Sequence, residues 1–179
     1  MTLRFIRRFA RARKGVAALE FAILAPMMMF LLFGSVDLLD LLDTNRRLQN
    51  AAVSLADVVA RDTEVTDAEV AGYWAALDLL MFPDQATDAD MRINSVSIEA
   101  DGTARVIWSE GYGMAARAAN DTLTLDEMPA GLRTPGTSII FAEGEMIYGA
   151  PLRFLLAGNI TLAHDAYRRS RLVDPIPRA

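Results

Sequence analysis

The chain of 179 residues contains no cysteine and only one histidine, His164. Without cysteine it can form no disulfide framework, thiol nucleophile, iron–sulfur cluster or cysteine-bearing zinc site. A single histidine argues against a Ser/His triad and against a multi-histidine metal site, because a lone histidine is usually structural or simply exposed. These absences predict a protein that is not an enzyme and that needs no metal or other cofactor.

Positive charge is scarce outside the N-terminus. Residues 1–15 hold six of the 18 basic residues and no acid, whereas the remainder holds 12 basic and 23 acidic residues, a net charge of −11. A strongly acidic body disfavours binding to nucleic acid. The segment Gly111-Tyr112-Gly113 lacks the third glycine and the lysine of a phosphate-binding loop and is better interpreted as a turn. We therefore expect neither a nucleic-acid partner nor a small-molecule substrate.

One long apolar run follows the basic segment. Residues 16–36 contain a single charged side chain, Glu20, and at about 1.5 Å per residue a helix of this length crosses about 30 Å of hydrocarbon. Basic residues precede the run, and Asp37 follows it. The positive-inside rule then predicts residues 1–15 as a cytoplasmic basic leader and 16–36 as the only transmembrane helix. Residues 37–179 would form a periplasmic domain of an inner-membrane protein.

Three interpretations of this N-terminus compete: a cleaved secretory signal, a plain single-pass anchor and a prepilin-type signal. A secretory signal has a shorter apolar region and a small-residue cleavage site after it, and here residues 37–44, DLLDLLDT, follow instead. A prepilin-type signal is cut before the apolar run. Gly15 stands at that position, followed by four apolar residues and then Glu20-Phe21. The plain anchor and the prepilin-type signal both stay open on these residues.

The spacing between Gly15 and Glu20 gives the prepilin-type interpretation a chemical rationale. A glycine fits any local backbone, so the Gly15–Val16 bond would be accessible to a peptidase at the membrane surface. Cleavage would create an α-amine on Val16, about one helical turn from Glu20. A carboxylate inside a membrane helix is costly and points to a function, and an amine of the same or a neighbouring subunit would be its partner. Alternatively, Glu20 snorkels to the interface.

These features resemble the TadE-like proteins of tight-adherence (Flp-type) pilus assembly. The resemblance rests at the N-terminus on Gly15, Glu20-Phe21-Ala22, Pro26, Gly34 and residues 47–52, and at the C-terminus on residues 129–136, Ala142-Glu143, Tyr148, residues 158–162, Arg168, Arg169 and Arg171. The resemblance implies a pseudopilin-like protein without catalytic activity. Some members of the family are cut by a prepilin peptidase. The aspartate-rich stretch after the apolar run departs from the usual family pattern.

The resemblance implies a pilin-like membrane component of pilus assembly or secretion. Its partners would be the inner membrane, other pilin-like subunits, the assembly machinery and a prepilin-type peptidase. It would act through packing of its N-terminal helix against other subunits, with cleavage at Gly15 and Val16, subunit pairing by Glu20 and a helix kink at Pro26. The alternative is a single-pass, membrane-anchored periplasmic interaction module unrelated to pili.

Residue periodicity predicts an α+β fold of the pilin-like kind, in which a long helix packs on an antiparallel sheet. Helical spacing of apolar residues continues past the membrane segment to about residue 62. Thr66 and Glu69 form a capping-box pattern that opens a second helix. The remaining expected elements are a hairpin of 91–99 and 103–109 with a bulge near Asn94-Ser95, a loop over 125–136, and strands over 138–148 and 159–168 around an apolar connection at 151–156.

The acidic side chains after the apolar run could suggest a calcium site. Their spacing of three places Asp37, Asp40 and Asp43 on one stripe of a helix instead of around a binding loop, so we interpret them as solvated. The pairs Asp43–Arg47 and Asp57–Arg61 have the i,i+4 spacing of helix-stabilising ion pairs.

Overall fold

The structure is a computed structural model that describes residues 15–179. The chain divides into two compact units. The first comprises Met1–Asp40 and Gly149–Gly158, and the second comprises Leu41–Tyr148 and Asn159–Ala179. The basic leader over 1–14 lies outside the described residues, so its expected role stays a prediction.

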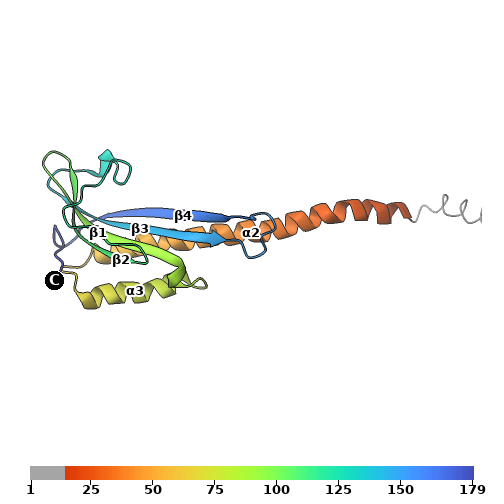
Figure 1. The fold of residues 1–179 in the computed structure, drawn as a ribbon, viewed down its shortest axis with the longest axis horizontal. Helices are drawn as coiled ribbons and strands as arrows, with labels where there is room; N and C mark the ends of the chain where they lie inside the picture. The colour runs from red at the N-terminus through yellow and green to blue at the C-terminus, as the bar shows by residue number, and fades with distance from the viewer. Residues whose placement is uncertain (1–14) are drawn as a thin grey trace, which may run out of the picture. The chain divides into compact units, whose positions relative to one another are not determined.

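A single helix, α2 (Val16–Val59), extends over 44 residues and ends close to the predicted end (Figure 1). The second helix, α3 (Asp67–Met81), begins as the capping box predicts. The Thr66 hydroxyl accepts the Glu69 backbone N–H at 3.3 Å, and the Glu69 carboxylate accepts the Thr66 backbone N–H at 2.6 Å. These reciprocal bonds satisfy two donors that would otherwise be unpaired at the helix start.

The second unit contains a four-stranded antiparallel sheet with the order β2-β1-β3-β4, which confirms the α+β class. Short 3₁₀ turns, η2 (Ala86–Asp88) and η3 (Ala130–Leu132), lie in the connections. The strands are β1 (Ala89–Ile98), β2 (Ala104–Tyr112), β3 (Ser138–Gly149) and β4 (Asn159–Arg169).

The β1–β2 hairpin contains the expected irregularity, one residue from the predicted place. Ser95 pairs with Trp108 and Val96 pairs with Val106, so the extra residue is Ile107 on β2. β1 itself pairs with β3 without interruption, and its side chains are buried on both faces of the sheet. The polar Asn94 and Ser95 in its middle are therefore fully buried. Two polar residues in a central strand interrupt the alternation of apolar and polar residues as a bulge would. The sequence therefore suggested a bulge on β1, whereas the extra residue lies on β2.

One core of the second unit lies between α2 and the sheet. The buried apolar residues in the second half of α2 are Leu48, Ala51, Ala52, Leu55, Ala56 and Val59, and Ala60 directly after the helix is buried with them. Gly144 of β3 permits the closest approach, because an added Cβ would lie 2.8 Å from the Met91 sulfur and 3.2 Å from a Leu48 methyl group. A larger residue there would push α2 away from β1 and β3.

A second core covers the opposite face of the sheet. It consists of Val96, Ile98, Ala104, Val106, Leu123, Met128, Ile139 and Phe141, with Leu132 and Tyr167 packed against it. The Phe141 and Tyr167 rings stack with centroids 4.7 Å apart. The connection between β2 and β3 thus acts as a second layer, although only one short 3₁₀ turn is regular within it.

Ion pairs in the second unit differ from the expectation at one position. Asp57 and Arg61 form the predicted i,i+4 pair, and Arg171 near the C-terminus joins the same carboxylate. Arg47, however, pairs with Asp84 at 2.9 Å instead of with Asp43. Asp84 follows α3 in sequence, so this contact fixes the end of that helix against α2. A tertiary contact has replaced a weak pair along the helix surface.

Candidate functional site

The predicted cleavage position lies at the exposed beginning of α2. Gly15 directly precedes the helix and Val16 is its first residue, and both are exposed. An added Cβ on Gly15 would meet no atom within 4 Å. The described part of the chain therefore imposes no steric need for glycine at this position, which is consistent with a requirement set by a partner molecule.

Glu20 and Pro26 both lie within the exposed part of α2. Glu20 is exposed one helical turn after Val16, and no hydrogen bond or ion pair joins it to another residue of the described range 15–179. Pro26 lies inside the helix, where its ring removes the amide that would bond the carbonyl of Ala22. The expected kink at Pro26 stays a prediction.

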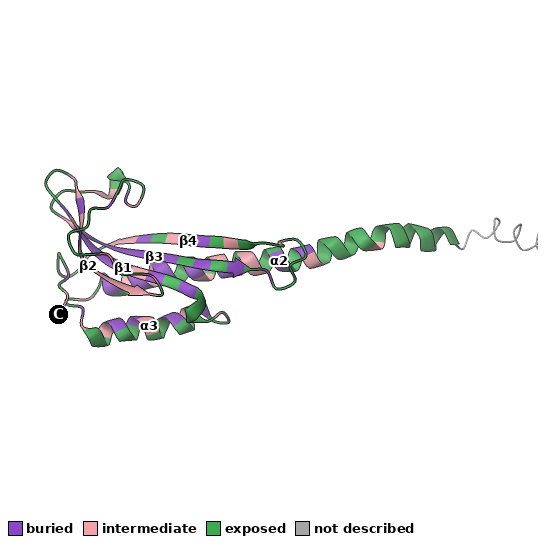
Figure 2. Ribbon diagram, viewed as in Figure 1, coloured by how far each residue is buried: buried purple, intermediate pink, exposed green. Residues whose placement is uncertain are grey.

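The apolar run of α2 exposes its side chains all around the helix. Figure 2 shows this part of α2 almost entirely as exposed, and its most apolar stretch is not buried at all. Among the described residues, α2 is the one helix that is long and apolar enough to span a membrane. In water such a surface would be strongly unfavourable, since burying each large side chain contributes about 1.5–3 kcal/mol. The surface needs an apolar environment, either lipid or other helices.

Asp37, at the end of the apolar run, is fully buried, which corrects the interpretation of this residue as solvated. Its carboxylate accepts three backbone N–H groups from the loop between β3 and β4. The donors are Leu152 at 3.1 Å, Phe154 at 2.8 Å and Leu155 at 3.1 Å. A carboxylate that accepts several backbone N–H groups makes strong, charge-assisted bonds. Asp37 therefore attaches this loop, which we call the 150–158 loop, to α2.

Apolar contacts extend the attachment of the 150–158 loop toward the membrane segment. The Phe154 ring lies 5.6 Å from the ring centroids of both Phe30 and Phe33. Leu155 lies over Gly34, where an added Cβ would be 3.6 Å from the leucine side chain. The sequence predicted an apolar connection here but gave no sign that Asp37 would hold it, because the two segments are more than a hundred residues apart.

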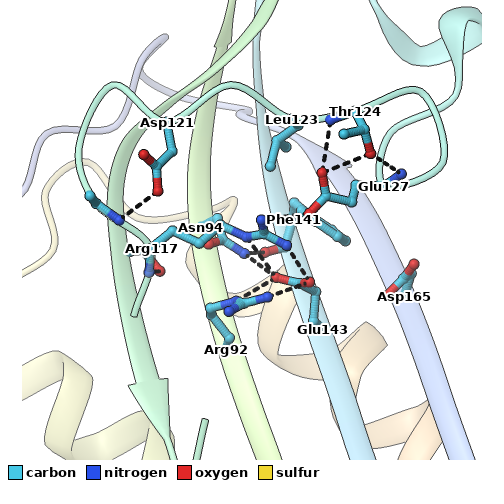
Figure 3. Close-up of polar contacts among 12 residues, drawn as sticks. Arg92, Asn94, Arg117, Asp121, Leu123, Thr124, Glu127, Phe141, Glu143 and Asp165 are labelled. Carbon is cyan, nitrogen blue, oxygen red and sulfur yellow. Dashed lines mark hydrogen bonds and ion pairs between the residues drawn. The ribbon is translucent and has the colours of Figure 1, made fainter. Parts of the chain in front are cut away.

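The second unit contains a buried ionic cluster, shown in Figure 3. Glu143 of β3 accepts two bonds from Arg92 of β1, at 2.6 and 2.7 Å, and two from Arg117, at 2.8 and 3.4 Å. The amide of Asn94 donates to the same carboxylate at 2.9 Å, and Arg117 also pairs with Glu127 at 2.6 Å. The cluster joins the sheet to the β2–β3 connection at two points along that connection.

The electrostatics of this cluster are those of structural ion pairs. Burial raises the pKa of Glu143, but the bonds from Arg92, Arg117 and Asn94 outweigh burial, so its pKa lies below the usual value. The backbone N–H of Thr124 is the largest influence on Glu127 and lowers the pKa of Glu127 to about 2. Both carboxylates are therefore ionised and fully paired at neutral pH, which suits a positioning role and not proton transfer.

Other candidates for chemistry have structural partners. His164 of β4 is hydrogen-bonded to Asn45 of α2 at 2.8 Å. Within residues 15–179, no group of three or more His, Asp or Glu side chains is arranged to hold a metal ion. The feature that sequence reasoning missed is the pairing of Asp37 with the 150–158 loop, for which the sequence carries no signal because the donors are backbone N–H groups.

Comparison with known proteins adds one finding. Residues 15–56 match the family model described as TadE-like protein. No curated protein and no solved structure matches the chain. The matched segment begins at Gly15, includes Glu20, Pro26 and Asp37, and extends into the part of α2 that packs on the sheet. Residues 15–56 of the chain are thus similar to TadE-like proteins.

Proposed function

We propose that the chain is a single-pass, pilin-like component of the inner membrane that acts in tight-adherence pilus assembly by packing α2 against other pilin-like helices. The TadE-like family implies a role in tight-adherence pilus assembly. The observation that carries the finer proposal is the apolar part of α2, which exposes side chains on every side and includes one acid. That surface offers other helices a large contact area.

The orientation follows from the charges at the two ends of the apolar run. Six basic residues precede it and acids follow, so the N-terminus faces the cytoplasm and residues 37–179 face the periplasm. The positive-inside bias depends on residues 1–14, whose structure lies outside the described range. The reverse orientation in the membrane would place the acidic domain in the cytoplasm. A topology reporter fused to the C-terminus distinguishes the two orientations.

Glu20 supplies the specific contact in this proposal. A carboxylate near the cytoplasmic side of the apolar run is costly to leave unpaired in lipid. After cleavage between Gly15 and Val16, the new α-amine of a neighbouring subunit provides the matching positive charge. The pair would fix the register of two helices whose other contacts are apolar and so tolerate sliding.

The first experiment determines the N-terminal residue of the protein purified from its own cells. We expect Val16, because a prepilin-type peptidase removes the six basic residues by cutting after Gly15. Gly15→Leu, which puts a bulky side chain where nothing in the described structure crowds it, should block cleavage without altering the fold. Met1 or Thr2 as the N-terminus of the wild-type protein, in cells that contain the peptidase, would favour the plain membrane anchor.

The second experiment replaces Glu20 by glutamine. Glu20→Gln should leave membrane insertion and cleavage intact but impair pilus formation, since the neighbouring amine loses its counter-charge. Asp43→Asn is the matched control, because it removes the same charge from an exposed α2 position outside the apolar run. If Glu20→Gln assembles as well as Asp43→Asn, Glu20 merely snorkels and the pairing role is wrong.

A further inference from the structure

The 150–158 loop has the composition of a segment that contacts lipid. Leu152, Phe154 and Leu155 are 49%, 47% and 43% exposed, although each belongs to the most apolar residue types. They follow one another within four residues, and the exposed Arg153 stands among them. A single exposed leucine needs no explanation, but three large apolar side chains on one short loop form a patch that does.

The contacts of the loop place it beside the last two turns of the apolar run. Phe154 touches Phe30 and Phe33, Leu155 covers Gly34, and the backbone bonds reach Asp37. From Phe30 to Val36 the helix rises about 9 Å. If residues 16–36 cross the bilayer, as the proposed function requires, the loop lies at the depth of the outer leaflet and its headgroup boundary. This inference therefore rests on the proposed function.

Irregular backbone at that depth is unfavourable unless its polar groups have partners. An unpaired N–H group in hydrocarbon costs several kcal/mol, and non-helical segments occur there only when those groups are satisfied. The Asp37 carboxylate accepts three N–H groups of this loop within 3.1 Å. One buried acid thereby satisfies three of the backbone N–H groups of this loop, and the loop in turn shields the Asp37 carboxylate from the apolar environment.

Arg153 fits the same location. Its backbone has φ of 50°, a left-handed conformation that is uncommon for arginine, and its side chain is exposed. Next to a bilayer, a long basic side chain can keep its charge among lipid phosphates while its stem lies along apolar chains.

We propose that the 150–158 loop is a second membrane-contacting element, which enters the outer leaflet beside α2 and is held there by Asp37. The occupant of its exposed apolar patch is lipid, because the patch lies beside the exposed apolar side chains of Phe30, Leu31 and Leu32 on α2. The bilayer would then hold the protein at two segments that are distant in sequence, restricting rotation of α2 within the membrane.

The absence of cysteine allows a direct test on the full chain. Leu152→Cys, Leu24→Cys and Leu125→Cys each receive an environment-sensitive fluorophore, and the proteins are reconstituted in phosphatidylcholine–phosphatidylglycerol vesicles. Nitroxide lipids carry the quencher either near the headgroup or near the end of the acyl chain. Leu24 lies in the apolar run, and Leu125 is an exposed leucine of the second unit. All three side chains are largely exposed, so labelling should not disturb packing.

We expect the label at position 152 to lie about 5–10 Å below the headgroups, with shallow nitroxides quenching it at least about twofold more than deep ones. The label at position 24 should prefer the deep nitroxide, and the label at position 125 should respond to neither. Quenching at 24 but not at 152 would overturn the inference while leaving the anchor intact. Absence of quenching at position 152 overturns the inference in either case, whether that label lies in water or is covered by a second copy of the chain. No quenching at 24 would overturn the proposed membrane anchoring itself.

Asp37→Asn tests the holding role of the acid. An asparagine has one acceptor oxygen and two donor hydrogens, so it cannot accept the three N–H groups. In this background the quenching at position 152 should fall at least about twofold, because the loop loses its attachment, whereas position 24 should not change. Asp43→Asn is the control for the loss of charge. Unchanged quenching at position 152 in Asp37→Asn would overturn the role assigned to Asp37.

Discussion

Replacing Glu143 by glutamine should strongly destabilise the second unit. The Glu143 side chain is only 13% exposed, and those of Arg92 and Arg117 are 16% and 15% exposed, so the three charges are largely removed from water. Removing the anion leaves the largely buried Arg92 with a neutral partner, while Arg117 keeps only its pair with Glu127. Breaking a buried ion pair in this way costs about 3–5 kcal/mol. For a chain of this length, about 2–4 °C per kcal/mol predicts a melting temperature lower by about 6–20 °C.

Near-ultraviolet circular dichroism during thermal unfolding in detergent measures this change. Trp108, whose indole N–H donates to the Ile176 carbonyl at 2.9 Å, reports on tertiary packing of the second unit. Glu145→Gln removes the same charge from an exposed position two residues along β3 and should shift the free energy of unfolding by no more than about 0.5 kcal/mol. Equal melting temperatures for the two variants would show that the cluster is effectively solvated, contrary to its exposure.

Two further predictions concern the second unit. Because the folded pKa of Glu127 is depressed to about 2, its contribution to stability should be complete above about pH 4.5 and should be lost as pH falls toward 2, and Glu127→Gln should flatten this part of a pH–stability profile from chemical unfolding. A chain that starts at Leu41 should fold as an acidic α+β domain. With a Gly/Ser linker in place of residues 150–157, this domain should be monomeric by light scattering. Failure to fold would show that the buried apolar side chains of α2 over 48–59 belong to an intermolecular interface.

Local patterns predicted the elements well because each depends on neighbouring residues. The capping box at Thr66 predicted the start of α3, and the predicted hairpin of 91–99 and 103–109 corresponds to β1 and β2. The cleavage and pairing roles of Gly15 and Glu20 stay predictions, since they depend on other molecules.

Long-range polar pairs could not be predicted in the same way. Arg47 pairs with Asp84 and not with Asp43, which is nearer in sequence. Asp37 accepts hydrogen bonds from a loop more than a hundred residues later. A charged residue on a helix has many partners of similar energy, and the choice depends on which segment the fold brings to it. Backbone N–H donors carry no sequence signature at all, so the role of Asp37 was visible only in the structure.

The two acids at the ends of the apolar run of α2 show how the structure divides the work of the TadE-like segment. Asp37 is fully buried and accepts three backbone N–H groups of the same chain. Glu20 is exposed and joined to no other residue in the described range. In a membrane, both acids need partners, yet only one obtains them by folding. Of the two acids, Glu20 is therefore the one to which we assign intermolecular pairing in the proposed function, whereas Asp37 holds the 150–158 loop.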